Sequence, residues 1–207
     1  YYDVNVTGSI SLLLAMMRAK CEHIVFSSSA TVYGIPQYLP YDEMHPTNPF
    51  NPYGHTKLMI ENIIKDWTKV SVKRQGTVLR YFNPVGAHET GQIGEEPIGI
   101  PNNLMPYIAQ VADGRQNCLN VFGNDYDTID GTGARDYIHV VDLAQAHIKA
   151  LDSKILDNFE VLNVGGGGGT TVLELLKSFE LTTGIKIKHK FLPRRDGDIA
   201  ASWADTS

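Results

Sequence analysis

The sequence has few cysteines and no long apolar run. Its 207 residues include only Cys21 and Cys118, too few for a dense disulfide framework or for a four-ligand zinc site of the usual kind. Because such scarcity is typical of a reducing compartment, we expect a cytoplasmic protein. No apolar run is long enough to cross a bilayer, so we expect no membrane partner.

The sequence also lacks an excess of positive charge. It has 18 Lys and Arg against 23 Asp and Glu, a formal net charge of −5. A protein that binds a phosphate backbone needs a basic face, so we expect no nucleic-acid partner. The 7 histidines are scattered, without acids at metal-ligand spacing, and we therefore expect no metal.

Helical and strand-like patterns alternate along the chain. Apolar residues recur at helical spacing near the start, as in Ile10, Leu13 and Met17, and short apolar runs elsewhere predict buried strands. This alternation predicts an α/β fold with a parallel sheet. The expected helices cover 4–19, 53–72, 104–113, 140–153 and 172–183, and the expected strands cover 23–29, 77–82, 119–122, 159–164 and 186–191.

The pattern changes after Asn83. Residues 84–101 are rich in glycine and proline and have little periodicity, which predicts a long loop, and long loops in compact domains tend to be functional. We therefore expect a soft domain boundary near Asn83. A sheet domain would include residues 1–83, and residues 84–207 would form mainly a second domain, with some segments returning to the sheet.

One pair of residues suggests proton-transfer chemistry. Tyr53 and Lys57 stand four residues apart after Asn51 and Pro52, at the expected start of a helix, so their side chains share one face. A tyrosine normally keeps its proton to about pH 10, and a nearby ammonium favours the phenolate. A lone Tyr-x-x-x-Lys pair is weak evidence of catalysis, because most such pairs on helices are structural.

The surrounding segments strengthen this interpretation. Ser29 ends an expected strand, and another expected strand runs into Arg80-Tyr81-Phe82-Asn83-Pro84. The carboxyl ends of parallel strands are where α/β folds place their ligands. Taken alone, Ser29 is as consistent with a helix cap as with a catalytic site. Together, a serine at a strand end, then Tyr-x-x-x-Lys, then Arg-Tyr-Phe-Asn-Pro is an order that resembles the extended short-chain dehydrogenase/reductase family.

Within that family the resemblance to UDP-galactose 4-epimerases covers nearly the whole chain. Nucleotide-sugar 4,6-dehydratases usually carry Thr-Asp-Glu where this sequence has Ala30-Thr31-Val32, so their dehydration carboxylates are missing. The matching stretches are 27–34, 51–57, 79–88, 99–107, 121–127, 131–142 and 193–198.

The resemblance implies a fold and a reaction. Residues 1–83 would form the C-terminal part of a Rossmann-like NAD-binding domain, and 84–207 mainly a smaller α/β domain that binds a UDP-hexose. Tyr53 would take the proton of the sugar 4-hydroxyl, hydrogen-bonded by Ser29, while hydride passes to tightly bound NAD. The 4-keto sugar would turn over and regain the hydride, which interconverts UDP-galactose and UDP-glucose. Lys57 would hold the nicotinamide ribose, with Tyr81 and Asn5 nearby.

The resemblance also implies a set of substrate-binding residues. Arg135 and Arg195 would grip the diphosphate, for which the planar guanidinium fork is suited; surface ion pairs are the alternative for both. Asp198 would bind a ribose, or be a solvated loop acid. The full expected set is Ser29, Ala30, Thr31, Tyr81, Phe82, Asn83, Asn102, Asn103, Leu104, Asn120, Val121, Phe122, Arg135, Arg195, Asp198 and Ser202.

Two features depart from the family pattern, and a run of glycines between them invites a phosphate-loop interpretation. Neither a Gly-x-x-Gly-x-x-Gly turn after a first strand nor the later adenosine-ribose acid is present, so we expect a piece of a longer protein rather than a true truncation. The run 165–169 is all glycine, but it comes late and lacks a following Lys-Ser/Thr, which favours a structural turn over a phosphate loop. Ser202 stands where some relatives carry a bulky tyrosine, which suggests room for N-acetylated UDP-hexosamines.

Two alternatives remain open at this point. One is another NAD-dependent nucleotide-sugar enzyme, such as a decarboxylase or uronate epimerase, which would need a carboxylate-binding group that the sequence does not reveal. The other is a non-catalytic binding or dimerising protein. The helices expected at 4–19 and 53–72 resemble those that pair across a two-fold axis in this superfamily, so we expect a homodimer through a four-helix bundle.

Overall fold

Three parallel strands form the main sheet. The computed structural model describes residues 1–153 and 157–207, and in it β1 (His23–Ser29), β2 (Gln75–Tyr81) and β7 (Phe159–Val164) pair in the order β1-β2-β7. Ser29 lies opposite Tyr81, and Tyr81 opposite Val164. All three strands therefore end at the same edge, which is where a parallel sheet presents residues to a ligand.

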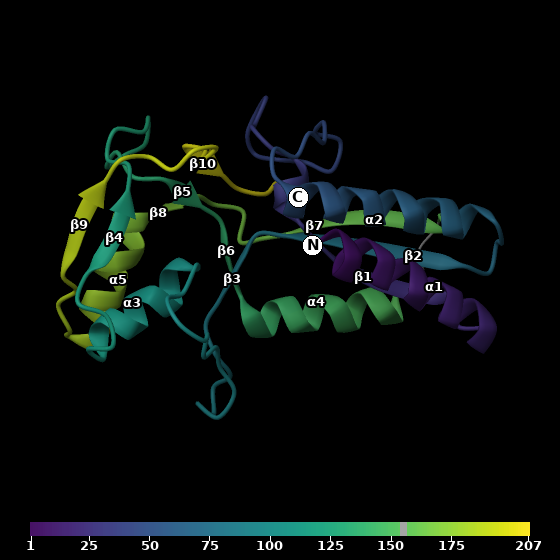
Figure 1. The fold of residues 1–207 in the computed structure, drawn as a ribbon, viewed down its shortest axis with the longest axis horizontal. Coiled ribbons are helices and arrows are strands. Elements are labelled where there is room, and N and C mark those ends of the chain that lie inside the picture. Colours follow the sequence, from purple (N-terminus) through teal and green to yellow (C-terminus); the bar gives the residue numbers. More distant parts are fainter. Residues whose placement is uncertain (154–156) are drawn as a thin grey trace.

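Helices cover both faces of this sheet (Figure 1). A π-helical turn, η1 (Tyr2–Thr7), continues into α1 (Gly8–Ala19), and α1 packs beside α2 (Pro52–Lys69). The helix α4 (Val140–Asp152) lies on the face opposite α2. The core between α1, α2 and the sheet is formed by Leu13, Met16, Ile60, Ile64 and Trp67.

A second group of elements lies at the other end of the molecule (Figure 1). The strands β4 (Leu119–Phe122) and β9 (His189–Leu192) are parallel, and α3 (Leu104–Ala112) and α5 (Val172–Thr183) pack on them. The capping box of Thr171 and Glu174 fixes the start of α5. Their core contains Ile108, Leu119, Val121, Leu176 and Ile187.

Short strands join the two groups. The strand β3 (Asn83–Val85) runs parallel to β6 (Tyr137–His139), and β5 (Ala134–Arg135) lies between β10 (Ala201–Ser202) and β8 (Thr170–Thr171). A 3₁₀ turn, η2 (Ala30–Val32), follows β1. These pairs bring residues near 83, 135 and 202 together, although they are far apart in the sequence.

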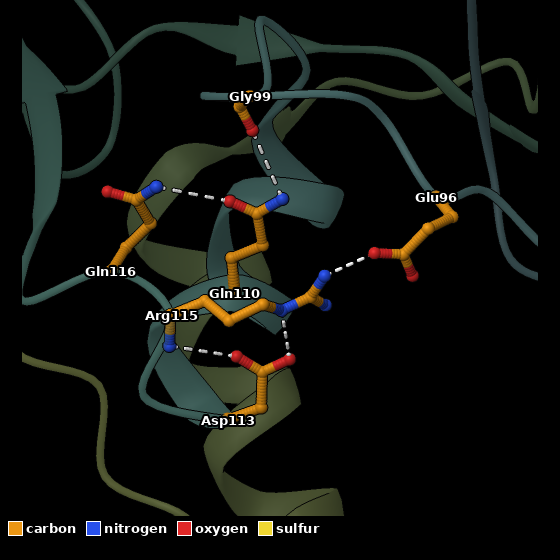
Figure 2. A network of polar contacts seen from close by, with 6 residues as sticks. All are labelled: Glu96, Gly99, Gln110, Asp113, Arg115 and Gln116. Carbon is orange, nitrogen blue, oxygen red and sulfur yellow. Dashed lines mark hydrogen bonds and ion pairs between the residues drawn. The ribbon is translucent and has the colours of Figure 1, made fainter.

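Polar contacts fasten the long loop to α3 (Figure 2). Arg115 pairs with Glu96 of the loop, and also with Asp113 at 2.7 Å. The buried Gln110 donates from Nε2 to the Gly99 carbonyl at 3.3 Å, and its own Oε1 accepts from Gln116 at 3.3 Å. The loop segment before α3 is therefore attached at Gly99 to α3 itself and at Glu96 to Arg115, which follows α3.

The α/β fold with parallel sheets is confirmed. The five expected helices are present with ends shifted by no more than a few residues, while the expected strand at 186–191 is displaced to His189–Leu192. The strands of two or three residues were not predicted, because such short segments carry no periodicity. Across the two described ranges, no helix is both long and apolar enough to cross a bilayer.

Candidate active site

Ser29, Tyr53, Lys57 and Tyr81 meet at the carboxyl edge of the main sheet. Ser29 ends β1 and Tyr81 ends β2, and the two are register partners. The helix α2 begins beside them because Asn51 caps it, its Oδ1 accepting from the Gly54 N–H at 2.8 Å, and because a proline occupies its first turn. Tyr53 and Lys57 therefore project from the first two turns of α2 toward the strand ends.

Burial dominates the electrostatics of this pair. It raises the pKa of the half-buried Tyr53, nearby Tyr81 and Tyr1 raise it further, and contact with the Ser29 hydroxyl lowers it. Burial also lowers the pKa of Lys57. The Lys57 ammonium lies 5.5 Å from the Tyr53 ring centroid and donates to the Ser27 carbonyl at 2.9 Å. Burial therefore outweighs the Ser29 contact, and the pKa of Tyr53 lies above its ordinary value in this geometry.

Asn5 lies against the first turns of α2. Its Nδ2 donates to Thr56 Oγ1 at 2.9 Å, next to Lys57 in the chain. Tyr1 packs edge-on against the Tyr53 ring, with 5.9 Å between centroids. The start of the chain is therefore in contact with the Tyr53 and Lys57 region.

A cavity of about 230 Å³, called here the inner cavity, lies at this strand edge. Ser29 and Tyr81 line it, and so does the buried Ser202 from β10. Inside it Ser29 Oγ accepts from Thr31 Oγ1 at 3.0 Å. The expected site residues in its wall are Ser29, Ala30, Thr31, Tyr81, Phe82, Asn83, Arg135, Asp198 and Ser202.

A larger cavity of about 450 Å³, called here the outer cavity, extends between α3 and β4. It shares Asn83, Arg135 and Asp198 with the inner cavity, so the two hollows adjoin. The expected residues in its wall are Asn83, Asn102, Asn103, Leu104, Asn120, Val121, Phe122, Arg135, Arg195 and Asp198. All the expected substrate residues thus line one or both of these cavities.

Two arginines converge on Asp198 where the cavities meet. Arg135 donates to Asp198 Oδ1 at 2.6 Å and Arg195 to Oδ2 at 3.1 Å. The Arg195 guanidinium also stacks 4.9 Å from the Phe122 ring centroid. The Asp198 side chain is only 15% exposed, so it is not a solvated loop acid. The cluster carries one net positive charge where the two cavities adjoin.

Several wall residues were not predicted. The outer cavity also includes Tyr107 and Tyr137, and burial raises the Tyr137 pKa. Both tyrosines fall in stretches that match the family, and Tyr137 follows Arg135 by two residues, a signal that could have marked it. The remaining unpredicted wall residues are Ile100, Pro101, Gly133 and Val172 in the outer cavity, and Gly34, Tyr41, Phe50, Gly197 and Ile199 in the inner one.

The glycine run forms a turn after β7, as the sequence predicted. The Gly166 and Gly167 N–H groups donate to the buried Asp136 carboxylate at 2.6 and 3.1 Å. A Cβ on Gly166 would lie 2.7 Å from the Tyr137 carbonyl oxygen, so glycine permits this close approach. An internal carboxylate already occupies these donors. No group of three or more His, Cys, Asp or Glu within residues 1–153 and 157–207 could hold a metal.

Comparison with known proteins places these features in a family. The profile described as "NAD dependent epimerase/dehydratase family" matches residues 1–165. The UDP-glucose 4-epimerase of Homo sapiens is 55% identical over 209 residues, which cover 100% of this chain and 60% of that protein. The enzyme of Bacillus subtilis (strain 168) is 53% identical over 207 residues, 99% of this chain and 61% of that protein.

Solved structures give the same result. A UDP-glucose-4-epimerase from Stenotrophomonas maltophila, crystallised with NAD and formylated UDP-arabinopyranose, is 52% identical with a TM-score of 0.96, covering 99% of this chain and 61% of that one. The Bifidobacterium longum enzyme, in complex with NAD+ and UDP, is 50% identical with a TM-score of 0.94, covering 99% and 62%. The chain spans about 60% of the length of the relatives it matches. Its sequence and fold show that it belongs to the NAD dependent epimerase/dehydratase family.

Proposed function

We propose that the protein carrying this chain interconverts UDP-galactose and UDP-glucose at sugar C4 with tightly bound NAD. The observation that carries the proposal is the meeting of Ser29, Tyr53 and Lys57 beside an inner cavity that adjoins an arginine-lined outer cavity. The similarity to UDP-glucose 4-epimerases over essentially the whole chain supports the same reaction.

In this proposal Tyr53 exchanges a proton with the sugar 4-hydroxyl. The phenol contacts Ser29, whose hydroxyl lines the inner cavity and can hydrogen-bond the same sugar oxygen. The raised Tyr53 pKa means that the phenol holds its proton at neutral pH in this geometry, so the residue can serve as the acid that protonates the 4-keto oxygen. As the base it needs extra positive potential, which Lys57 is close enough to contribute.

The residues present fit the nicotinamide end of NAD. Lys57 carries three donors, and the Ser27 carbonyl is an acceptor for one of them, so the ammonium can also hold ribose hydroxyls. Tyr81 and Asn5 would lie beside the nicotinamide. When bound, NAD supplies a hydride acceptor that returns the hydride in the same turnover.

The outer cavity suits the UDP part of the substrate. Arg135 and Arg195 offer planar donor forks to a diphosphate, and Asp198 holds both in place and can accept from a ribose hydroxyl. Asn102, Asn103 and Leu104 line this cavity at the start of α3, and the N-terminus of a helix favours an anion. Asn120, Val121 and Phe122 of β4 would lie along the uridine. Ala30, Thr31, Phe82 and Asn83 would surround the sugar.

The wider organisation follows from the same proposal. Residues 1–83 would belong to the NAD-binding domain and 84–207 mainly to the UDP-sugar domain, with β7 contributing to the sheet. The protein would be cytoplasmic. It would also form a homodimer through a four-helix bundle, because α1 and α2 pack side by side and α1 exposes Ile10, Leu14 and Met17. Light scattering checks the dimer, and a monomer at micromolar concentration would contradict it.

Substitution of Tyr53 tests the reaction. Tyr53→Phe removes the hydroxyl with little change in shape, so epimerisation of UDP-galactose should fall by on the order of 10²-fold or more, the usual weight of one acid-base group. Bound NAD, measured after protein denaturation, should be unchanged. Equal turnover by wild type and Tyr53→Phe would show that the assignment of Tyr53 is wrong. Turnover of UDP-glucuronic acid by the wild type tests the decarboxylase and uronate epimerase alternatives.

Ser202 bears on the range of substrates. It is 8% exposed in the wall of the inner cavity, so a small side chain there leaves room beside the sugar. We propose that the enzyme also accepts UDP-N-acetylhexosamines. Ser202→Tyr should abolish turnover of UDP-N-acetylglucosamine while UDP-galactose turnover continues. Equal use of both substrates by the variant and wild type would contradict this.

A further inference from the structure

A buried polar cluster lies directly behind the proposed catalytic residues. Arg80 donates to Glu61 through Nε at 3.1 Å and through Nη2 at 2.6 Å, a two-point ion pair. Ser28 donates its hydroxyl to the same Glu61 carboxylate. The side chains of Arg80 and Glu61 are only 8% and 4% exposed, and Ser28 is fully buried.

Each member of this cluster is next to a residue of the site. Ser28 precedes Ser29 on β1, and Arg80, its register partner, precedes Tyr81 on β2. Glu61 lies four residues beyond Lys57 and eight beyond Tyr53, so all three share one face of α2. The cluster therefore joins the helix that carries the acid-base pair to the two strands that carry its partners.

The cluster also reaches the third strand. The Arg80 guanidinium lies 4.9 Å from the centroid of the Tyr33 ring, and the Tyr33 hydroxyl donates to Asn163 Oδ1 on β7 at 2.7 Å. Tyr33 is fully buried and follows η2, the turn after Ser29. The Arg80 guanidinium on β2 thus contacts Glu61 on α2 and Tyr33 in the segment that follows β1.

Stability alone is a poor explanation for such a pair. Two buried charges are costly to desolvate, and apolar residues of similar volume often leave a fold as stable or more stable. The two-point geometry is specific, however, because two guanidinium nitrogens of Arg80 must reach the same Glu61 carboxylate. We propose that Glu61, Arg80 and Ser28 position the catalytic site by setting the register of α2 against β1 and β2, so that Tyr53 meets Ser29.

This inference rests on the proposed epimerase function, and its test separates the two. The main variant is Glu61→Met with Arg80→Met, which removes both charges at similar volume. The matched control is Asp66→Asn with Lys69→Gln, which removes the exposed ion pair of the same helix, whose atoms are 2.9 Å apart. Glu61→Gln keeps the shape of the side chain and one acceptor oxygen, and it replaces the double variant in the test if that variant does not fold.

Kinetics of the complete protein give the first result. We expect the double methionine variant to unfold at a similar urea concentration and to keep its KM for UDP-galactose within about threefold. Its kcat should fall by roughly 10- to 100-fold, since a misplacement of about 1 Å can cost on the order of 10²-fold. Glu61→Gln should lose less, and the exposed control nothing. A wild-type kcat in a folded variant overturns the positioning role.

Two further readouts exclude a merely structural role. The groups facing Tyr53 are Ser29, Tyr81, Lys57 and Tyr1. Contact with Ser29 lowers the Tyr53 pKa, so its loss should move the acid limb of the kcat profile to higher pH. A crystal structure of the variant should show a longer Tyr53 to Ser29 separation, a measurement that needs no turnover, and an unchanged separation overturns the inference. Loss of activity in Tyr53→Phe with full activity in the double methionine variant leaves the proposed function standing.

Discussion

Asp136 provides the sharpest test of how this chain holds its site together. The residue is fully buried between Arg135 and Tyr137. Its carboxylate accepts from the Gly166 N–H at 2.6 Å through Oδ1, and from the Gly167 and Ala204 N–H groups at 3.1 and 3.0 Å through Oδ2. It therefore fastens the glycine turn and the segment after Ser202 to the strand that carries Arg135.

The structure predicts different costs for two substitutions. Asp136→Ala leaves the buried Ala204 N–H without its acceptor, at about 1–3 kcal/mol, and removes two part-buried bonds from Gly166 and Gly167, at about 0.5–1.5 kcal/mol each because water can reach these exposed residues, so the loss is roughly 2–6 kcal/mol. Asp136→Asn can keep its amide oxygen at the Oδ2 position, where two of the donors point. Its NH₂ then faces the Gly166 N–H, so one part-buried bond is lost, at about 0.5–1.5 kcal/mol.

Urea denaturation of the purified variants measures this difference. The transition midpoint should decrease from wild type to Asp136→Asn and again to Asp136→Ala, with Asp127→Asn, an exposed acid to amide change, as the control at the wild-type midpoint. The reasoning is refuted if Asp136→Asn is as stable as wild type, or if it is as unstable as Asp136→Ala. Substrate KM should rise in Asp136→Asn, because Arg135 and Ser202 lie beside the released segments.

Two further perturbations have clear expected results. Gly34→Ala places a Cβ on a left-handed residue, at φ 75°, and against the Asn48 carbonyl, whereas Gly114→Ala has φ 83° but open space around it. Thermal unfolding should show a loss of about 1–2 kcal/mol for Gly114→Ala and clearly more for Gly34→Ala, and equal losses would contradict the steric argument. Burial raises the pKa of Tyr41 to about 12, above its unfolded value, so it contributes stability that is present below pH 10 and lost as the pH rises to 12. Denaturation midpoints from pH 9 to 11.5 should therefore fall less steeply in Tyr41→Phe than in wild type, although that variant also loses the 2.8 Å bond to the Gly34 carbonyl.

Periodic segments were predictable from the sequence because burial forces a repeating pattern on them. The helix at Val172–Thr183 and the strands at Leu119–Phe122 and Phe159–Val164 were located to the residue. In contrast, β5, β8 and β10 have two residues each, so local sequence had nothing to repeat. Their pairing depends on partners up to 67 positions away, such as Ala201 opposite Ala134.

The candidate site shows the same division. The residue types and the Tyr-x-x-x-Lys spacing marked Tyr53, Lys57 and Ser29 as candidates, and the resemblance marked part of the walls of both cavities. The sequence did not reveal that Lys57 donates to the Ser27 carbonyl, or that burial keeps the Tyr53 pKa high. Desolvation depends on every neighbouring element, so the pKa of a side chain is not determined by its position on one helix.

The buried cluster behind the site is a clearer case. Glu61 looks like an ordinary polar residue of an amphipathic helix, and Arg80 like part of a family stretch. Only the packing of α2 across β1 and β2 brings their charges together at 2.6 Å and removes them from water. Sequence by itself determined the longer elements and the family, and it marked Tyr53 and Lys57 as candidates for an acid-base pair, because these follow from local periodicity and short motifs. The tertiary structure decided the register of that pair, the two adjoining cavities and the meeting of Arg135 and Arg195 at Asp198, because these depend on distances between segments remote in the chain.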